Sequence, residues 1–373
     1  MTDVSPLVLA QEARVWLEEV GAEAPPDWGP IMPPEERSVG MAWQRRLHAA
    51  GFAAIHWPDH LGGRGLTRAH TAAWTEACAR AGVPSVLNMV GLVLVAEALL
   101  AHGTPEQQAA HLPVTARGEV VWCQLFSEPE AGSDLASLST RADSDGAGGF
   151  VINGQKVWSS GARASDRGIL LARTDPEAPK HRGISAFLID MDATGIECRP
   201  LRQMTGGSEF DEVFLTDLEL PPDSLLGPLH GGWGVAMATL TNERGHIGAS
   251  TVGLARRVDA LVVQARDHGD LRTVDRDRLV DDWVRAQVLL ALAARQGPIA
   301  SVASSLLKLA MTELSVTVAE HRVSRIGLRA TLLGEAACQT LLASPGARLG
   351  GGTSEVQRNI LGELVLGLPR EPR

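Results

Sequence analysis

The hydrophobic pattern of this chain changes its period twice, and this change limits the fold more than any other feature. Up to about residue 112, apolar residues recur at the spacing of amphipathic helices. From about 118 to 222, short β-prone runs alternate with Gly, Pro and Asp turns. After residue 231 the helical spacing returns. The sequence therefore predicts a helical region, a strand region and a second helical region.

The start of one helix is especially well marked, because Thr104 offers an N-cap hydroxyl and Pro105 suits the first helical position. The expected helices of the first region are 10–20, 35–50, 67–81, 86–102 and 105–111. Those of the last region are long enough for an up-and-down bundle, and they are 234–266, 275–296, 299–325, 332–342 and 353–366.

Short strands at close spacing favour a small antiparallel barrel or sandwich in the middle region. The expected strands are 120–126, 150–153, 155–159, 168–173, 184–191, 196–201 and 212–220. Asn153-Gly154 separates two of these strands and predicts a hairpin turn. We place the domain boundaries at 1–117, 118–227 and 228–373.

Composition excludes several classes of protein. The chain has 373 residues, 45% of them apolar and 21% charged, as expected for a well-buried globular protein of two or three subdomains. Its 34 basic and 44 acidic residues give a net charge of −10, and no dense Lys/Arg run is present. Nucleic acid is therefore not an expected partner.

The cysteines are dispersed without a Cys-x-x-Cys pair, which favours reduced thiols in a cytoplasmic protein over disulfides or a metal site. No secretory signal is visible, and the longest apolar stretch, 86–100, is shorter than the roughly 20 residues of a membrane span. Dinucleotide-binding, Walker and His-Glu-x-x-His motifs are missing. We expect no membrane association and no metal.

Two segments of the strand region are candidates for a binding site. The stretch 121–134 begins as a strand and ends in Glu-Pro, Ala-Gly and Ser-Asp, so it can present the hydroxyls of Ser127 and Ser133. An ordinary strand end at the surface is at least as good an interpretation. Trp158, beside small hydroxyl residues, suits a planar heterocycle such as flavin, or equally a plug at the end of a barrel.

Two further candidates lie in the last region. Three glycines at 350–352 lead into a helix start where Ser354 and Gln357 fit a capping box, and such a start can bind an anionic group. Glu243 lies on a mostly apolar helix beside Arg244. It could act as a general base in a dry pocket, although periodicity alone favours a solvated carboxylate.

Four segments, in this order and at this spacing, resemble the acyl-CoA dehydrogenase family over nearly the whole chain. They are 126–134 (Phe-Ser-Glu-Pro-Glu-Ala-Gly-Ser-Asp), 153–161 (Asn-Gly-Gln-Lys-Val-Trp-Ser-Ser-Gly), 242–245 (Asn-Glu-Arg-Gly) and 351–358 (Gly-Gly-Thr-Ser-Glu-Val-Gln-Arg). The resemblance implies a multi-domain α+β fold with an N-terminal helical domain, a middle antiparallel β-barrel domain and a C-terminal four-helix bundle. It also implies assembly as homo- or hetero-dimers or tetramers.

The resemblance further implies FAD as cofactor. The positions that match cofactor-binding residues of the family are Phe126, Ser127, Gly132, Ser133, Trp158, Ser160, Thr353 and Glu355. By resemblance, Trp158 packs against the isoalloxazine, Ser160 approaches N5, and Thr353 with Glu355 holds the diphosphate region. Ser133, Arg244 and Gly351 match positions that contact the substrate.

The implied reaction is α,β-dehydrogenation of an acyl-CoA thioester, with a proton lost to a Glu carboxylate and a hydride to flavin N5. An electron-transfer flavoprotein would then accept the electrons. Most members place this Glu where Gly351 stands here, whereas isovaleryl- and long-chain-type members carry it at the position of Glu243. The resemblance therefore names Glu243 as the base. The backbone N–H of Gly351 can still polarise the thioester carbonyl.

One family element is altered. Residues 266–270 read Arg-Asp-His-Gly-Asp where Arg-x-x-Phe-Gly is expected, which bears on FAD affinity and on the sharing of FAD between subunits. The C-terminal segments look most like actinobacterial dehydrogenases, some of which act on steroid or branched acyl-CoA thioesters and some of which pair two different subunits. Fatty acid or steroid side-chain metabolism is thus implied. Helix 86–100, with Gly91 and Ala96, is the expected wall of the acyl pocket.

Two alternatives stay open. The chain could be a base-competent or silent partner subunit of a heteromeric dehydrogenase, as the altered 266–270 element and Gly351 suggest. It could also be a flavin oxidase or monooxygenase on the same fold. Three observations distinguish these hypotheses. Bleaching of bound flavin by acyl-CoA indicates a competent dehydrogenase, a need for a second chain indicates a partner subunit, and direct consumption of oxygen indicates an oxidase or monooxygenase.

Overall fold

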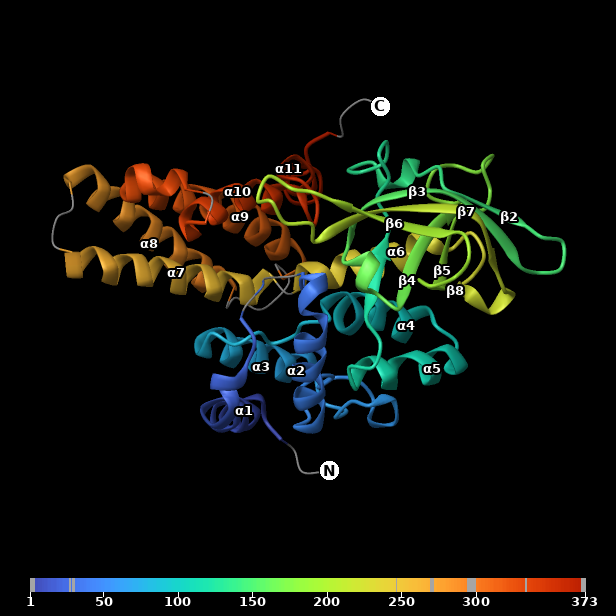
Figure 1. Ribbon diagram of the computed structural model, residues 1–373, viewed down its shortest axis with the longest axis horizontal. Coiled ribbons are helices and arrows are strands. Elements are labelled where there is room, and N and C mark those ends of the chain that lie inside the picture. The colour runs from blue at the N-terminus through green and yellow to red at the C-terminus, as the bar shows by residue number, and fades with distance from the viewer. Residues whose placement is uncertain are drawn as a thin grey trace. The chain divides into compact units, whose positions relative to one another are not determined.

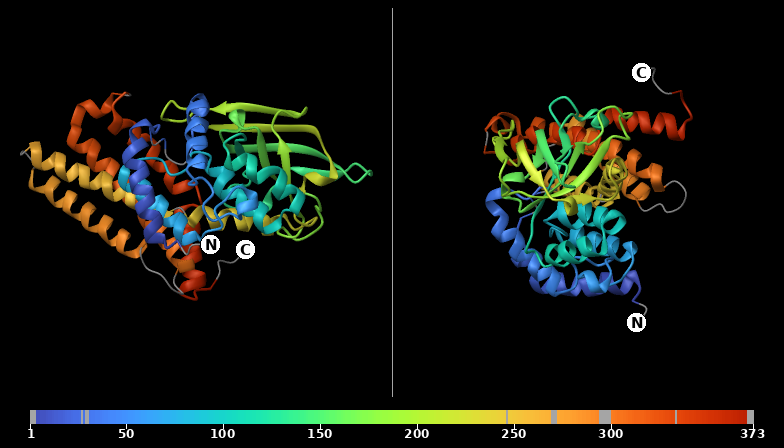
Figure 2. Two further views of the ribbon diagram at one scale, coloured as in Figure 1. Left: turned by 90° about the horizontal axis from the view of Figure 1, so that it is seen from below. Right: turned by 90° about the vertical axis from the view of Figure 1, so that its right-hand side faces the viewer.

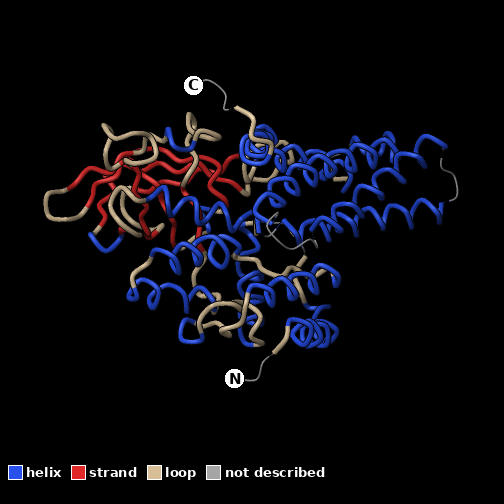
Figure 3. The backbone as a smooth tube through the Cα atoms, turned by 180° about the vertical axis from the view of Figure 1, so that it is seen from behind, coloured by secondary structure: helices blue, strands red, loops and turns tan. Residues whose placement is uncertain are grey.

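The structure is a computed structural model that describes residues 4–26, 28, 31–245, 247–268, 272–293, 300–332 and 334–369, without the side chains of 241–250, 268 and 300–303. The chain divides into two compact units, 1–203 with 207–242 and 204–206 with 243–373. Along the chain, helices come first, strands follow and helices return (Figure 1 and Figure 3). The predicted fold class is confirmed.

The first unit begins with helices close to their predicted positions. They are α1 (Pro6–Val20), α2 (Arg37–Ala49), α3 (Arg68–Ala81), a π-helical turn (Val90–Val95) that runs into α4 (Ala96–His102), and α5 (Pro105–Ala116). The predicted start of α5 is confirmed, because the Thr104 hydroxyl accepts a hydrogen bond from Gln107 N and the Gln107 side chain bonds back to Thr104 N. This helix continues past its predicted end and includes Pro113.

The strands form one sheet. They are β1 (Trp122–Leu125), β2 (Arg141–Ser144), β3 (Phe150–Ser160), β4 (Arg167–Arg173), β5 (Ile184–Asp190), β6 (Ile196–Leu201), β7 (Phe210–Leu220) and β8 (Leu225–Leu226). The hydrogen-bonded order is β6-β7-β3-β2-β4-β5-β8, and β1 pairs with β4. Most pairs are antiparallel, as predicted, but β1 and β2 each run parallel to β4.

The predicted hairpin at Asn153-Gly154 is wrong. Residues 150–160 form one long strand, β3, and Gly154 lies inside it at an irregular point of its pairing with β7. A Cβ on Gly154 would lie 2.4 Å from Thr140 Oγ1, so this glycine allows a close approach of two chain segments and not a turn. The actual hairpin joins β2 and β3 through residues 145–149.

Central strands of the sheet are buried on both faces. Along β4, Ile169 and Leu171 pack in a core shared with helices, while Leu170 and Ala172 pack in a core made by the sheet and its turns. The helices therefore cover one face, and the sheet curls around its own side chains on the other (Figure 2). This double burial makes the strands a rigid support for the loops at their ends.

The second unit is helical. The predicted helix 234–266 is described as α6 (Gly232–Gly245), which starts in the first unit, and α7 (Ile247–His268), and residue 246 between them lies outside the described residues. Then follow α8 (Thr273–Ala293), α9 (Ala300–Ile326), α10 (Ala336–Leu349), α11 (Ser354–Ile360) and a π-helical turn (Leu361–Val365). Helices α7 to α10 run alongside one another as a bundle (Figure 1). Within the described ranges, every helix is too short or too polar to cross a bilayer.

Candidate functional site

The loop 126–134 leaves β1 as a tight turn. Glu128 and Ala131 exchange two backbone hydrogen bonds of 3.1 Å each around Pro129 and Glu130. Past this turn Gly132 and Ser133 are exposed, and a Cβ on Gly132 would meet nothing within 4 Å. Ser127 is half-buried, and its carbonyl accepts a hydrogen bond of 2.9 Å from Val157 N of β3. The two segments predicted as candidates in the strand region therefore lie side by side.

Trp158 is held in an unusual backbone conformation on β3. Its φ is 57°, in the left-handed region that bulky residues rarely adopt, and it lies where the pairing with β7 shifts between Lys156 and Ser159. The indole is 59% exposed and contacts the ring of Phe210 edge-on, at a centroid distance of 5.8 Å. Backbone strain of this kind persists where surrounding structure maintains it, often at binding sites. The bulge thus presents a flat aromatic ring to the outside.

A buried hydroxyl lies beside this tryptophan. Ser159 is fully buried, and its Oγ has no hydrogen-bond partner among the described residues. Ser160, the residue predicted from the family resemblance, is half-buried at the end of β3. Gly161 follows with φ 59°, and a Cβ there would meet nothing within 4 Å. Open space and an unpartnered hydroxyl both occur within this short segment.

A buried ion pair lies beneath the loop and the bulge. Lys156 Nζ is 2.8 Å from Glu128 Oε1 and donates to the carbonyl of Phe126 at 3.2 Å. Burial lowers the pKa of Lys156 to about 8, and Glu128 opposes this effect. Burial alone would raise the pKa of Glu128, but the Lys156 ammonium and several hydrogen bonds outweigh it and lower this pKa to about 2. Glu128 is therefore ionised at neutral pH.

A second ion pair follows the bulge. Arg163 Nη1 lies 2.6 Å from Asp211 Oδ1 and 2.6 Å from the carbonyl of Ser208. Asp211 is fully buried and also accepts a bond of 3.0 Å from Arg163 N. The Gly161 N–H donates to the carbonyl of Glu209 at 2.8 Å. Charged groups thus hold the bulge from both of its ends.

The glycine-rich segment lies in the second unit. Thr353 caps α11, since its Oγ1 accepts a bond of 3.2 Å from Val356 N. The predicted capping box of Ser354 with Gln357 is wrong, because Ser354 Oγ donates to Glu313 and Gln357 Nε2 donates to the carbonyl of Gly351. The buried Lys308 donates to the carbonyls of Gly352, at 2.6 Å, and Arg348.

Four other predicted residues follow from the family resemblance. Gly351 has φ 65°, which its lack of a Cβ permits, and Glu355 is exposed near Arg358, with 3.8 Å between their charged atoms. Glu243 and Arg244 belong to α6, and their side chains lie outside the described residues. Residues 269–270 of the altered 266–270 element also lie outside them.

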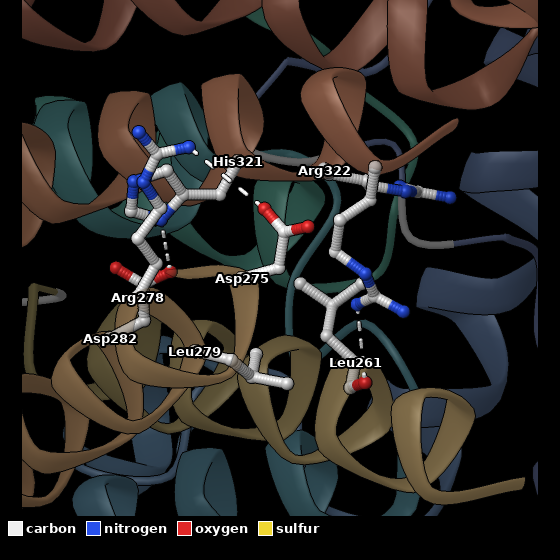
Figure 4. A pocket seen from close by; sticks show the side chains of 8 residues that line it. Leu261, Asp275, Arg278, Leu279, Asp282, His321 and Arg322 are labelled. Atoms are coloured by element: carbon white, nitrogen blue, oxygen red, sulfur yellow. Dashed lines mark hydrogen bonds and ion pairs between the residues drawn. The ribbon is translucent and has the colours of Figure 1, made fainter. Parts of the chain in front are cut away.

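The helical bundle contains another polar cluster, between α8 and α9. His321 Nδ1 is 2.6 Å from Asp282 Oδ2, while the second carboxylate oxygen of Asp282 has no described partner (Figure 4). The enclosed space has a volume of about 10 Å³. Burial raises the pKa of Asp282, and His321 opposes this effect. The space suffices for roughly one water molecule and not for a substrate.

Three family profiles cover nearly the whole chain. The acyl-CoA dehydrogenase N-terminal domain matches residues 8–119, the middle domain residues 123–218, and the C-terminal domain residues 230–366.

The chain belongs to the acyl-CoA dehydrogenase family.

Relatives of similar sequence carry the same family name, and solved structures of similar fold cover nearly the whole chain. Acyl-CoA dehydrogenase IpdE1 of Mycobacterium tuberculosis is 40% identical over 345 residues, which are 89% of each chain. The solved steroid ACAD Tcur3481-Tcur3483 matches with a TM-score of 0.84 and 27% identity over 98% of each chain. The ChsE4-ChsE5 complex of Mycobacterium tuberculosis matches with a TM-score of 0.77 and 27% identity, over 98% of each chain. The predicted family and enzyme class are confirmed.

The ion pair beneath the candidate site was not singled out from the sequence. Glu128 was considered only in the Glu-Pro turn and segment 126–134, and Lys156 only within segment 153–161. A lysine that precedes the bulge within a β-prone run was the available signal, because an isolated charge on a buried strand requires a partner.

Proposed function

We propose that this chain is an FAD-dependent dehydrogenase that introduces an α,β double bond into an acyl-CoA thioester. The observation that carries the proposal is the exposed, strained Trp158 held beside the serine-bearing loop 126–134. A soluble enzyme has little reason to keep an exposed indole in a left-handed conformation unless the ring faces a ligand. Membership of the acyl-CoA dehydrogenase family supports flavin as that ligand.

The residues around Trp158 fit an isoalloxazine. Gly132 and Gly161 both leave open space where a side chain would begin, and Ser159 Oγ is an unpartnered hydrogen-bonding group. Phe126, Ser127, Gly132 and Ser133 would line the flavin from the loop, and Trp158 and Ser160 from β3. Thr353 and Glu355 would contact the diphosphate. FAD, when bound, would take up the β-hydrogen and two electrons as the Cα–Cβ double bond forms.

The chain's own groups would handle the substrate and the proton. The Glu243 carboxylate would accept the α-proton, which the neighbouring thioester carbonyl acidifies. Ser133 and the backbone N–H of Gly351 would orient that carbonyl and stabilise the negative charge that develops on it. Arg244 would contact the substrate beside the base. An electron-transfer flavoprotein would reoxidise the enzyme.

The purified protein should be yellow, and its flavin absorbance should bleach when a suitable acyl-CoA is added without oxygen. A panel of fatty, branched and steroid acyl-CoA thioesters would define the substrate, and a steroid thioester is included because a structural neighbour is a steroid ACAD. The Glu243→Gln variant should bind FAD and remain unbleached. Full activity of this variant would exclude Glu243 as the base.

A second candidate function is that of a subunit in a heteromeric dehydrogenase. The solved neighbour ChsE4-ChsE5 is described as a complex, and residues 266–270 depart from the family element. Colourless protein that acquires flavin only when it is produced together with a second acyl-CoA dehydrogenase chain would favour this function. Direct oxygen consumption during turnover would instead indicate an oxidase.

A further inference from the structure

Lys156 is a fully buried cation beneath the candidate flavin site. Moving an ammonium group out of water costs several kcal/mol unless its hydrogen bonds and charge are compensated. Here the compensation comes from loop 126–134, through Glu128 Oε1 at 2.8 Å and the Phe126 carbonyl at 3.2 Å. A strand residue is thus bonded to both sides of Ser127.

Glu128 extends this connection to the far end of the loop. Its Oε2 accepts bonds from Ser139 N at 2.7 Å and Ser139 Oγ at 2.8 Å, and its Oε1 accepts one from Thr140 N at 2.9 Å. Both ends of the segment 128–140 therefore converge on one carboxylate. The exposed Gly132 and Ser133 lie within that segment, so their position depends on the carboxylate staying in place.

Lys156 also lies immediately before the bulge. The next residue, Val157, donates to the Ser127 carbonyl at 2.9 Å, and Trp158 follows. We propose that Lys156 is the positioning residue of the site, because its ammonium holds loop 126–134 against β3 so that Ser127 and Ser133 face the same ligand as Trp158. This inference rests on the proposed function in taking FAD as that ligand.

A purely structural role for the ion pair makes different predictions. Buried ion pairs contribute little net stability compared with apolar or neutral replacements, although removal of one partner alone is strongly destabilising. If the pair only stabilises the fold, any variant with normal stability should bind FAD normally. If Lys156 positions the loop, a neutral pair should restore stability without restoring FAD affinity.

Three variants separate the two roles. Lys156→Met removes the ammonium. Lys156→Met combined with Glu128→Gln removes both charges and keeps one side-chain oxygen as acceptor, where the carboxylate offers one oxygen to Ser139 N and the other to Thr140 N. Ile152→Ala is the matched control, because Ile152 is a fully buried residue of the same strand that faces the core of the sheet. Each apoprotein is examined by thermal unfolding, by FAD titration and by hydrogen exchange of residues 126–140 without FAD.

We expect the double variant to regain part of the melting temperature lost in Lys156→Met, because it no longer buries an unpaired carboxylate. It should nevertheless bind FAD roughly tenfold or more weakly, because only a fraction of molecules hold the binding-competent loop. Its loop amides should exchange faster than those of the wild type. Ile152→Ala should lose stability and keep both the FAD affinity and the loop protection of the wild type.

Wild-type FAD affinity and loop protection in the double variant would overturn the inference, as would an equal loss of affinity in Ile152→Ala at matched stability. A wild-type apoprotein that fails to take up FAD would instead count against the proposed function. In that case, hydrogen exchange of residues 126–140 in the apoprotein still tests whether Lys156 positions the loop. Unchanged exchange in the double variant contradicts the positioning role, and faster exchange supports it.

Discussion

The two units each contain a buried lysine beneath a segment that the family resemblance assigns to FAD, and the two lysines are compensated differently. Lys156 faces the carboxylate of Glu128 and one carbonyl. Lys308 donates to the carbonyls of Gly352 and Arg348, near the C-terminal end of α10 where the helix dipole is negative. Loss of the first lysine leaves the buried carboxylate of Glu128 without its cation, whereas the two carbonyls that accept from Lys308 are neutral. The sheet segment should therefore be the more sensitive of the two.

The largest effect is expected for Lys156→Met. Removing one partner of a buried ion pair typically costs about 3–5 kcal/mol, because the remaining carboxylate has no counter-charge. Urea unfolding followed by circular dichroism measures this loss. If the free energy of unfolding fell by less than about 1 kcal/mol, the pair would contribute no more than an exposed ion pair. The expected difference from Lys308 would then be absent.

The carboxylate of the same pair, Glu128, should make the stability of the protein depend on pH. Because the folded-state pKa of Glu128 is lowered from 4.5 to about 2, its ionised form stabilises the fold above pH 4.5. That contribution, about 3 kcal/mol, is lost as the pH falls from 4.5 through 2. Urea midpoints between pH 6 and pH 2.5 should show this decline, and Glu128→Gln should flatten it. An equally steep decline in the variant would assign the pH dependence to other carboxylates.

Lys308→Met should have an intermediate effect of about 2 kcal/mol, since it removes charge-assisted bonds to two carbonyls. Thermal unfolding gives the comparison with Lys156→Met under the same conditions. Equal losses in the two variants would mean that the type of partner does not matter.

The smallest effect is expected at the cap of α11. Thr353→Ala should cost about 1 kcal/mol, because Val356 N loses its acceptor. Ser354→Ala is the control for the cap, as its hydroxyl contacts Glu313 and not the first turn of the helix. Thermal unfolding of both variants tests the assignment. A larger loss of stability in Ser354→Ala than in Thr353→Ala would indicate that Ser354 caps the helix, as the sequence predicted.

Much of the fold follows from hydrophobic period, and the errors have local causes. Strand β2 was missed because Arg141–Ser144 is almost entirely polar. At Asn153-Gly154 the local turn signal is overridden by pairing with β7 on both sides of the dipeptide, and β7 is as long as β3. Local propensity fails where a long partner strand is present.

The candidate site, like the fold, could be predicted only in part from the sequence. The serine-bearing loop and the tryptophan segment could be chosen from the sequence because turn residues and an aromatic stand out. Their side-by-side placement and the ion pair beneath them depend on contacts between residues 28 positions apart, which no local pattern encodes. The domain boundaries at 117/118 and 227/228 and the roles of Glu243 and Arg244 stay predictions.

The exposed indole of Trp158 also makes the protein its own optical probe. The chain has 9 tryptophans and no tyrosine, and Trp158 is the most exposed of these tryptophans at 59%, followed by Trp283 at 42%. A water-soluble collisional quencher such as iodide will therefore reach Trp158 before the buried indoles. Any molecule that stacks on this ring must shield it, so the loss of quenching reports occupancy without a label and without turnover.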